Sequence, residues 1–82
     1  PEPLFHGDFK IISQRLVGEK HLKLVLQSAQ NGPALDAIAF NIDLDVWPNP
    51  TISHAQVAYT LDINEFRGNE SLQLMVSSIS PR

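Results

Sequence analysis

The chain has 82 residues, of which 43% are hydrophobic and 18% are charged, a balance typical of one globular domain and not of a disordered tail. Six Lys and Arg residues against nine Asp and Glu residues give a net charge of −3, which excludes a polycationic surface of the kind that grips duplex DNA unaided. The absence of Cys excludes a disulfide scaffold, a thiolate zinc site and a cysteine nucleophile.

The first predicted strand contains a change of face. Phe9 and Ile11 share one parity, whereas Ile12 and Leu16 share the other. Because side chains alternate between the two faces of a strand, the inward face must switch near Ile11-Ile12 through a bulge or a sharp bend. Gly18-Glu19 then predicts a tight hairpin in which the glycine adopts a positive φ.

The second and third strands follow with a turn between them at Asn31-Gly32-Pro33. The second strand is predicted from a leucine at every second position, and we expect these residues, Leu22, Leu24 and Leu26, to point inward. The third covers residues 35–41, and we expect Ile38 and Phe40 to form its inward pair.

A long connection over residues 42–54 contains Pro48 and Pro50, which leaves room for one helical turn at residues 44–47 but for no longer helix. We expect Trp47 to plug one end of the fold. Two more strands follow around a turn at Gly68, which is also expected to have a positive φ. Val57, Tyr59, Leu61 and Ile63 share one face of the first of these strands, and Leu72, Leu74 and Val76 are the expected inward residues of the second.

Three strands, an interruption and a hairpin predict an all-β fold, namely a five-stranded Greek-key OB-fold barrel with a short helical turn or loop between strands 3 and 4. A small sandwich or an SH3-like barrel is the structural alternative. One domain is expected over residues 1–82, with about 5–79 structured. The predicted interior comprises Leu22, Leu24, Leu26, Tyr59, Leu61 and Leu74.

Several strings resemble the OB-fold domain near the C-terminus of the bacterial RecJ family of single-strand-specific exonucleases. They are Ile38-Ala39-Phe40-Asn41, Trp47-Pro48, the run from Tyr59 to Asn69, Ser71-Leu72-Gln73-Leu74 and, in the first hairpin, the run from Gly18 to Lys23. The resemblance spans about residues 5–79, and its most specific part is the Asn-Glu-Phe-Arg-Gly loop followed by Gln-Leu.

The resemblance implies a bacterial, cytoplasmic parent enzyme that degrades single-stranded DNA from the 5′ end in recombination and repair. In such a parent, Mg²⁺ or Mn²⁺ is held by Asp and His clusters of a separate core, and none of those clusters is present here, so no catalytic or metal-binding residue is assigned to this chain. The implied partners are single-stranded DNA, the catalytic core of the same polypeptide and, as a further candidate, a single-stranded-DNA-binding protein. No apolar run approaches the roughly 18 residues that span a bilayer, so no membrane partner is expected.

The basic residues are concentrated near the N-terminal half of the chain, since residues 24–66 contain no Lys or Arg. In an OB-fold the ligand groove runs over strands 2 and 3 and the loops that join strands 1–2 and 4–5. Cations follow phosphates there, and an aromatic ring offers a stacking platform for bases of any sequence. The candidate nucleic-acid-binding residues are Arg15, Lys20, His21, Lys23, Phe66 and Arg67. The alternative is that the two lysines are ordinary solvent-exposed residues at a sheet edge and that Phe66 packs on the barrel rim.

The acidic stretch contains Asp43, Asp45, Asp62 and Glu65. A calcium loop needs more oxygen ligands at regular offsets, so these carboxylates are interpreted as a solvated face or as a docking surface for another domain. Two functions therefore stay open: a DNA-binding module and a protein-interaction or interdomain scaffold module. Convergence of Lys20, Lys23 and Arg67 on one concave face favours the first, and acids between them favour the second.

Overall fold

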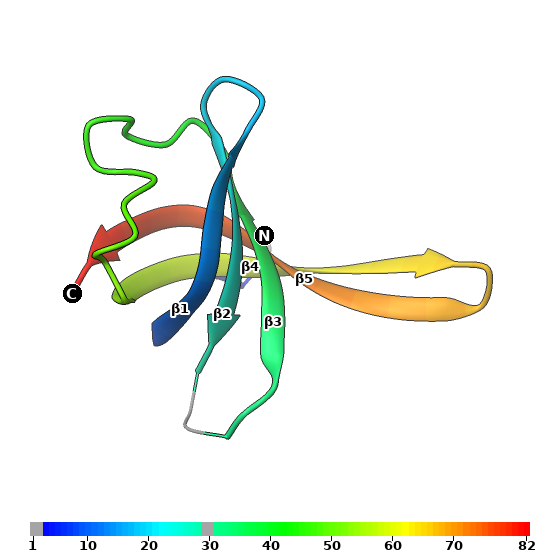
Figure 1. Cartoon of the computed structure of the whole chain (residues 1–82). Coiled ribbons are helices and arrows are strands. Elements are labelled where there is room, and N and C mark those ends of the chain that lie inside the picture. The colour runs from blue at the N-terminus through cyan, green and yellow to red at the C-terminus, as the bar shows by residue number, and fades with distance from the viewer. Residues whose placement is uncertain (1–2, 29–30) are drawn as a thin grey trace.

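The computed structural model describes residues 3–28 and 31–82, and within these ranges the chain forms a closed five-stranded barrel (Figure 1). Its strands are β1 (Phe5–Val17), β2 (His21–Gln27), β3 (Ala34–Ala39), β4 (His54–Phe66) and β5 (Asn69–Pro81). They close in the order β1-β2-β3-β5-β4, with β3 and β5 parallel and the other neighbours antiparallel. The Greek-key OB-fold barrel predicted from the sequence is therefore confirmed.

Leucines of β2 fill the interior of the barrel. Leu22, Leu24 and Leu26 are fully buried, and the register places Leu22 opposite Ala39 and Leu24 opposite Ala37. The two alanines are buried as well, because a narrow barrel lined by large side chains on one strand accepts small ones on the next. The prediction that Ile38 and Phe40 point inward was wrong: Ile38 is only half-buried, and Phe40 is exposed.

The predicted change of face in β1 is confirmed by a shift in the β1–β2 register between Ile11 and Ser13. Phe9 and Ile11 are buried before the shift, as expected. Ile12 and Leu16, however, remain exposed after it. The half-buried residue of their parity is Gln14, whose side chain hydrogen-bonds to the β3–β4 connection instead of entering the apolar core.

The β3–β4 connection contains the single predicted turn and closes one end of the barrel. The amides of Val46 and Trp47 both donate to the Asp43 carbonyl, at 3.0 and 2.9 Å. Trp47 is 2% exposed and belongs to the core cluster, as expected. Gln14 of β1 ties the connection to the barrel, since its Nε2 donates to the Asn49 carbonyl and its Oε1 accepts from the Asn49 amide, both at 2.8 Å.

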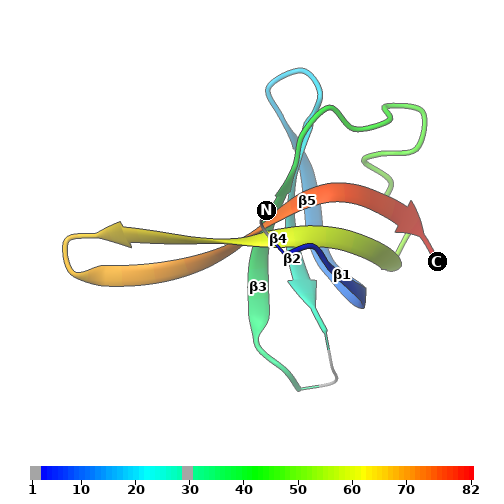
Figure 2. The same ribbon diagram turned by 180° about the vertical axis from the view of Figure 1, so that it is seen from behind.

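The β4–β5 hairpin extends beyond the barrel (Figures 1 and 2). β1 pairs with β4 only as far as Tyr59, and β3 pairs with β5 only from Gln73 onward, so residues 60–72 have no third strand beside them. Leu61 and Leu72 are consequently 47% and 41% exposed, and the prediction that they lie in the interior was wrong. Leu74 and the half-buried Tyr59, nearer the barrel, do contribute to the core as predicted.

Replacing Leu24 and Leu61 by alanine, one at a time, tests which of the two leucines belongs to the barrel core and which lies on the exposed part of the β4–β5 hairpin. Leu24→Ala is expected to lower the free energy of unfolding by about 2–5 kcal/mol, because it leaves a cavity in the closed barrel. Leu61→Ala removes the same atoms from an exposed position and should change it by only about 0.5 kcal/mol. Chemical denaturation of the two variants measures both values, and equal losses would contradict this assignment of the interior.

Candidate nucleic-acid interface

The outer face of β1, β2 and β3 brings two of the predicted cations together. Arg15 lies opposite Lys23 in the β1–β2 register, and Lys23 lies opposite Ile38 of β3. Residues that face each other in antiparallel strands project on the same side of the sheet, with Cβ atoms roughly 5 Å apart. Since Leu22 and Leu24 point into the core, Lys23 and its partners point outward. Arg15 and Lys23 thus form one cationic row on the outside of the barrel.

An aromatic pair lies beside this cationic row. The rings of His21 and Phe40 meet edge to face, with centroids 5.2 Å apart and planes at 72°. The Asn41 amide donates to His21 Nδ1 at 3.3 Å, which holds the imidazole in place, while Phe40 is 49% exposed. A large aromatic surface held near cations is what an unpaired base needs for stacking.

Phe40 is a candidate functional residue that sequence reasoning missed. It was predicted to point inward, but its parity is opposite to that of Ala37 and Ala39, which are buried. Leu35, Ala37 and Ala39 are apolar residues of one parity, and this was the signal that could have placed Phe40 outside.

Lys20 belongs to the same end of the barrel. It is exposed in the β1–β2 turn, next to His21, and its carbonyl accepts a hydrogen bond from the Ile42 amide at 2.9 Å. This bond ties the turn to the segment that follows Phe40. Gly18 in the turn has φ +67°, so the predicted positive φ is confirmed.

Arg67 lies elsewhere, at the tip of the β4–β5 hairpin, whereas Lys20 lies at the tip of the β1–β2 hairpin (Figures 1 and 2). Arg67 has φ +53° and Gly68 has φ +81°, which are the two consecutive positive φ values of a type I′ turn. Phe66 ends β4 opposite Asn69, and its side chain lies outside the part of the molecule that the structure describes. Of the predicted residues, the structure brings together Arg15, Lys20, His21 and Lys23, and it leaves Arg67 on a separate projection.

The carboxylates of Asp36 and Asp62 lie on the outer face between the Arg15–Lys23 row and the tip of the β4–β5 hairpin. Asp36 is opposite Val25 on one side and pairs with Gln73 on the other, and Gln73 in turn is opposite Asp62. This acidic row is adjacent to the row that contains Lys23 and Ile38. The cationic end of the outer face is therefore separated by acids from the hairpin tip.

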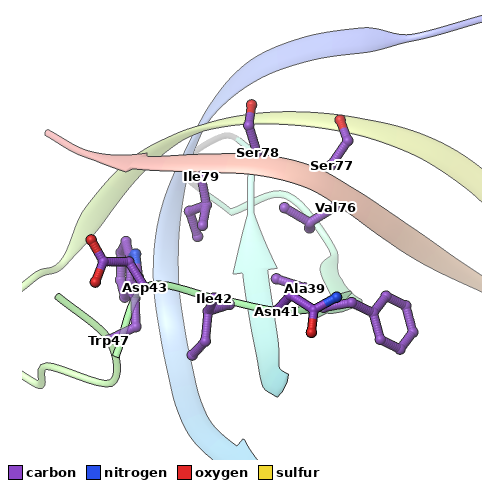
Figure 3. Close-up of a pocket in the computed structure, with 10 residues that line it drawn as sticks. Ala39, Asn41, Ile42, Asp43, Trp47, Val76, Ser77, Ser78 and Ile79 are labelled. Carbon is purple, nitrogen blue, oxygen red and sulfur yellow. The ribbon is translucent and has the colours of Figure 1, made fainter. Parts of the chain in front are cut away.

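A hollow of about 220 Å³ lies between the end of β3 and β5, with Phe40 among its lining residues. Figure 3 shows Val76 and Ile79 pointing from β5 toward the segment that contains Ala39 and Ile42, with Asp43 at the opposite end from Asn41. Its lining combines apolar side chains, such as Val76 and Ile79, with polar groups of Asn41 and Asp43. The hollow extends the surface beside the aromatic pair around the end of the barrel.

Metal-ligating groups are dispersed within residues 3–28 and 31–82, where no three His, Asp or Glu side chains gather closely enough to hold an ion. Asp43 accepts the Asp45 amide on its Oδ1 at 3.0 Å, which stabilises the turn before Trp47. A search of these same residues for a helix long and apolar enough to cross a membrane finds none.

Comparison with known proteins gives the family. The sequence model described as RecJ OB domain matches residues 1–78. The chain belongs to the RecJ OB-domain family. Similar proteins named "Single-stranded-DNA-specific exonuclease RecJ" occur in Escherichia coli strain K12, with 54% identity over 81 residues, and in Haemophilus influenzae, with 54% identity over 83 residues. Each comparison covers 99% of this chain but only 14% of the relative.

A solved structure of RecJ from Thermus thermophilus in complex with Mg²⁺ has the same fold, with a TM-score of 0.70 and 23% sequence identity. The match covers 100% of this chain and 12% of that one. The predicted resemblance to the RecJ OB-fold domain is thereby confirmed.

Replacement of Arg67 by asparagine or by alanine tests the turn at the hairpin tip. Both variants remove the guanidinium, but only asparagine adopts the left-handed conformation without a large penalty. Arg67→Asn is therefore expected to be more stable than Arg67→Ala by about 1 kcal/mol, measured by thermal or chemical unfolding. Equal stability of the two variants would show that the left-handed conformation is not retained in solution.

Proposed function

We propose that this chain is the accessory single-stranded-DNA-binding module of a longer 5′-to-3′ single-strand-specific exonuclease that acts in recombination and repair in the bacterial cytoplasm. Membership of the RecJ OB-domain family and the names of its relatives support this proposal. Because the chain spans 14% of those relatives, hydrolysis with Mg²⁺ or Mn²⁺ is assigned to a core outside it. A single-stranded-DNA-binding protein remains a candidate partner of the whole enzyme.

The observation that carries the proposal is the juxtaposition of a cationic row with an exposed aromatic pair. Arg15 and Lys23 are available to two successive phosphates, while Phe40, supported by His21, offers a face to an unpaired base. Stacking depends on a π-face that every base has, so such a site binds any sequence. Duplex DNA keeps its bases stacked inside the helix and gains only the phosphate contacts.

The acidic row limits the path that a bound DNA strand can take over the surface. A phosphodiester backbone is repelled by Asp36 and Asp62, so the path that the charges favour follows Phe40, Lys23 and Lys20 at one end of the barrel. Arg67, at the tip of the β4–β5 hairpin, lies beyond the acidic row and away from this path, so its contact with DNA stays a prediction. With a net charge of −3, the module alone should bind weakly.

An interdomain scaffold is the second candidate function. The carboxylates between Lys23 and Arg67 favour it, and so does the exposed apolar surface of the β4–β5 hairpin. The two functions use different surfaces and do not exclude each other.

The salt dependence of binding tests the cationic row. A labelled oligonucleotide of thymidines is titrated with the chain at several salt concentrations, and fluorescence anisotropy gives Kd. Each phosphate contact to a single strand contributes about 0.7 to the log-log salt slope, so the double variant Arg15→Gln with Lys23→Gln should lower its magnitude by about 1.4.

The matched control for this prediction is Lys10→Gln. Lys10 is also an exposed cation of β1, but it lies five residues and roughly 15 Å along the strand from Arg15. The Lys10→Gln variant should therefore leave the log-log salt slope unchanged. A slope that responds equally to Lys10→Gln and to the double variant would refute a localised site.

Truncation of Phe40 tests the aromatic pair separately from the charges. Phe40→Ala should weaken binding to single-stranded DNA by about 1–3 kcal/mol, or roughly 5- to 150-fold, and leave the salt slope unchanged because no phosphate contact is lost. The same anisotropy titration measures both quantities. Unchanged affinity would remove Phe40 from the interface.

A further inference from the structure

The projecting part of the β4–β5 hairpin has one apolar face that continues from the core. Ile63 lies opposite Leu72, and Leu61 lies opposite Leu74, so all four side chains project on the same side. Leu74 is 1% exposed and lies in the core, whereas Leu61, Leu72 and Ile63 are 47%, 41% and 65% exposed. We call these last three residues the hairpin apolar face.

The N-terminal part of β1 enlarges this surface. Phe5 stacks on Tyr59 with ring centroids 5.7 Å apart, and Phe5 lines a small hollow together with Leu61. Phe5 itself is 41% exposed. The apolar surface is therefore contiguous from Phe5 along the hairpin, unlike isolated apolar side chains, which occur on every protein surface.

The outer end of the hairpin apolar face is acidic. Glu65 and Glu70 lie directly opposite each other, and each is two residues from an apolar member of the face, so both carboxylates project on the same side as that face. Like charges in directly opposed positions destabilise a strand pair. A cation on a bound surface would relieve this repulsion, so the chemistry of the face favours a partner that is apolar with Lys or Arg at its edge.

We propose that the hairpin apolar face docks on another part of the same long polypeptide, which presents an apolar patch bordered by Lys or Arg. The relatives are about seven times longer than this chain, which spans 14% of their length. A tethered partner has a high effective concentration, so a small surface suffices for docking. A free second copy requires an interface of about 1,000 Å² or more, which three side chains and Phe5 do not supply.

This docking leaves the proposed DNA site accessible. The hairpin projects from one part of the barrel, and the β1–β2 turn with Lys20 projects from another (Figures 1 and 2). The inference shares with the proposed function the premise that the chain is one module of a longer protein, but it does not depend on DNA binding. It assigns the β4–β5 hairpin to assembly and the β1–β2 end of the barrel to the substrate.

Hydrogen–deuterium exchange tests the docking in the absence of DNA, with the 82-residue chain and the full-length polypeptide compared under the same conditions. The amides of residues 61–64 and 71–72 belong to a two-stranded segment without further support in the short chain. They are expected to exchange at least about tenfold more slowly in the full-length protein, because docking suppresses local opening of the hairpin.

The double variant Ile63→Lys with Leu72→Lys should abolish this extra protection in the full-length protein. The matched control is Ile12→Lys with Leu44→Lys, which alters two apolar residues of similar exposure, 49% and 55%, away from the hairpin. The control should retain the protection. Because both double variants add the same charge, only loss of a specific contact distinguishes them.

Equal exchange of the hairpin in the short and full-length proteins would overturn the proposal, as would equal effects of the two double variants. Dimerisation of the short chain that Ile63→Lys with Leu72→Lys abolishes, detected by light scattering, would overturn it in favour of a second copy as the occupant. Retained DNA binding with absent hairpin protection refutes only the docking, whereas retained protection with absent DNA binding refutes only the proposed function.

Discussion

The packing of β2 leucines against β3 alanines is the constraint on which the outer surface of this domain depends. A closed barrel of five strands has little interior volume, and Leu22, Leu24 and Leu26 occupy much of it. The facing positions of β3 must then be small, as Ala37 and Ala39 are. Ile38 of β3, and Phe40 directly after that strand, have the opposite parity and lie outside the core, whereas Leu35 at the start of β3 packs against it. A core requirement thus determines that Phe40 is available at the surface.

Two irregularities in the strand registers set which side chains reach each surface. The shift between Ile11 and Ser13 brings Arg15 opposite Lys23, on the outside of the barrel. The shift between Ala58 and Tyr59 places Leu61 in line with Leu74 of the core, although Leu61 itself is beyond the last β1 pairing. Bulges are a recognised means of redirecting side chains near functional sites. In this domain the shift in β1 directs cations to the outside of the barrel. The shift in β4 places apolar side chains on the solvent-exposed part of the β4–β5 hairpin.

The sequence predicted the elements well because alternation and turn residues are local signals. The five strands, the face change in β1, the positive φ of Gly18 and Gly68, and the burial of Trp47 were all found. The errors at Phe40, Leu61 and Leu72 have a common cause. Alternation gives the two faces of a strand but does not say which face is inside, or how far the strand continues past its neighbours. Those facts depend on pairing between strands that are distant in sequence.

The candidate site was only partly predictable for the same reason. Arg15, Lys20, His21 and Lys23 are close in sequence, and one hairpin brings them together. Arg67 was grouped with them by analogy with the OB-fold groove, yet the length of the β4–β5 hairpin, which no local pattern specifies, places it at another tip. Phe66 stays a prediction, because its side chain lies outside the described structure.

The separation of charges suits an accessory module better than an autonomous binding protein. An exonuclease must let its substrate advance after every cut, and a few phosphate contacts with sequence-independent stacking hold a strand without fixing its register. In the proposed function, repulsion by the acidic row containing Asp36 and Asp62 restricts a bound DNA strand to one end of the barrel. A weak site of this kind is effective only when tethering keeps it near the catalytic centre. The proposed binding and the proposed docking thus use two different hairpins of the same fold.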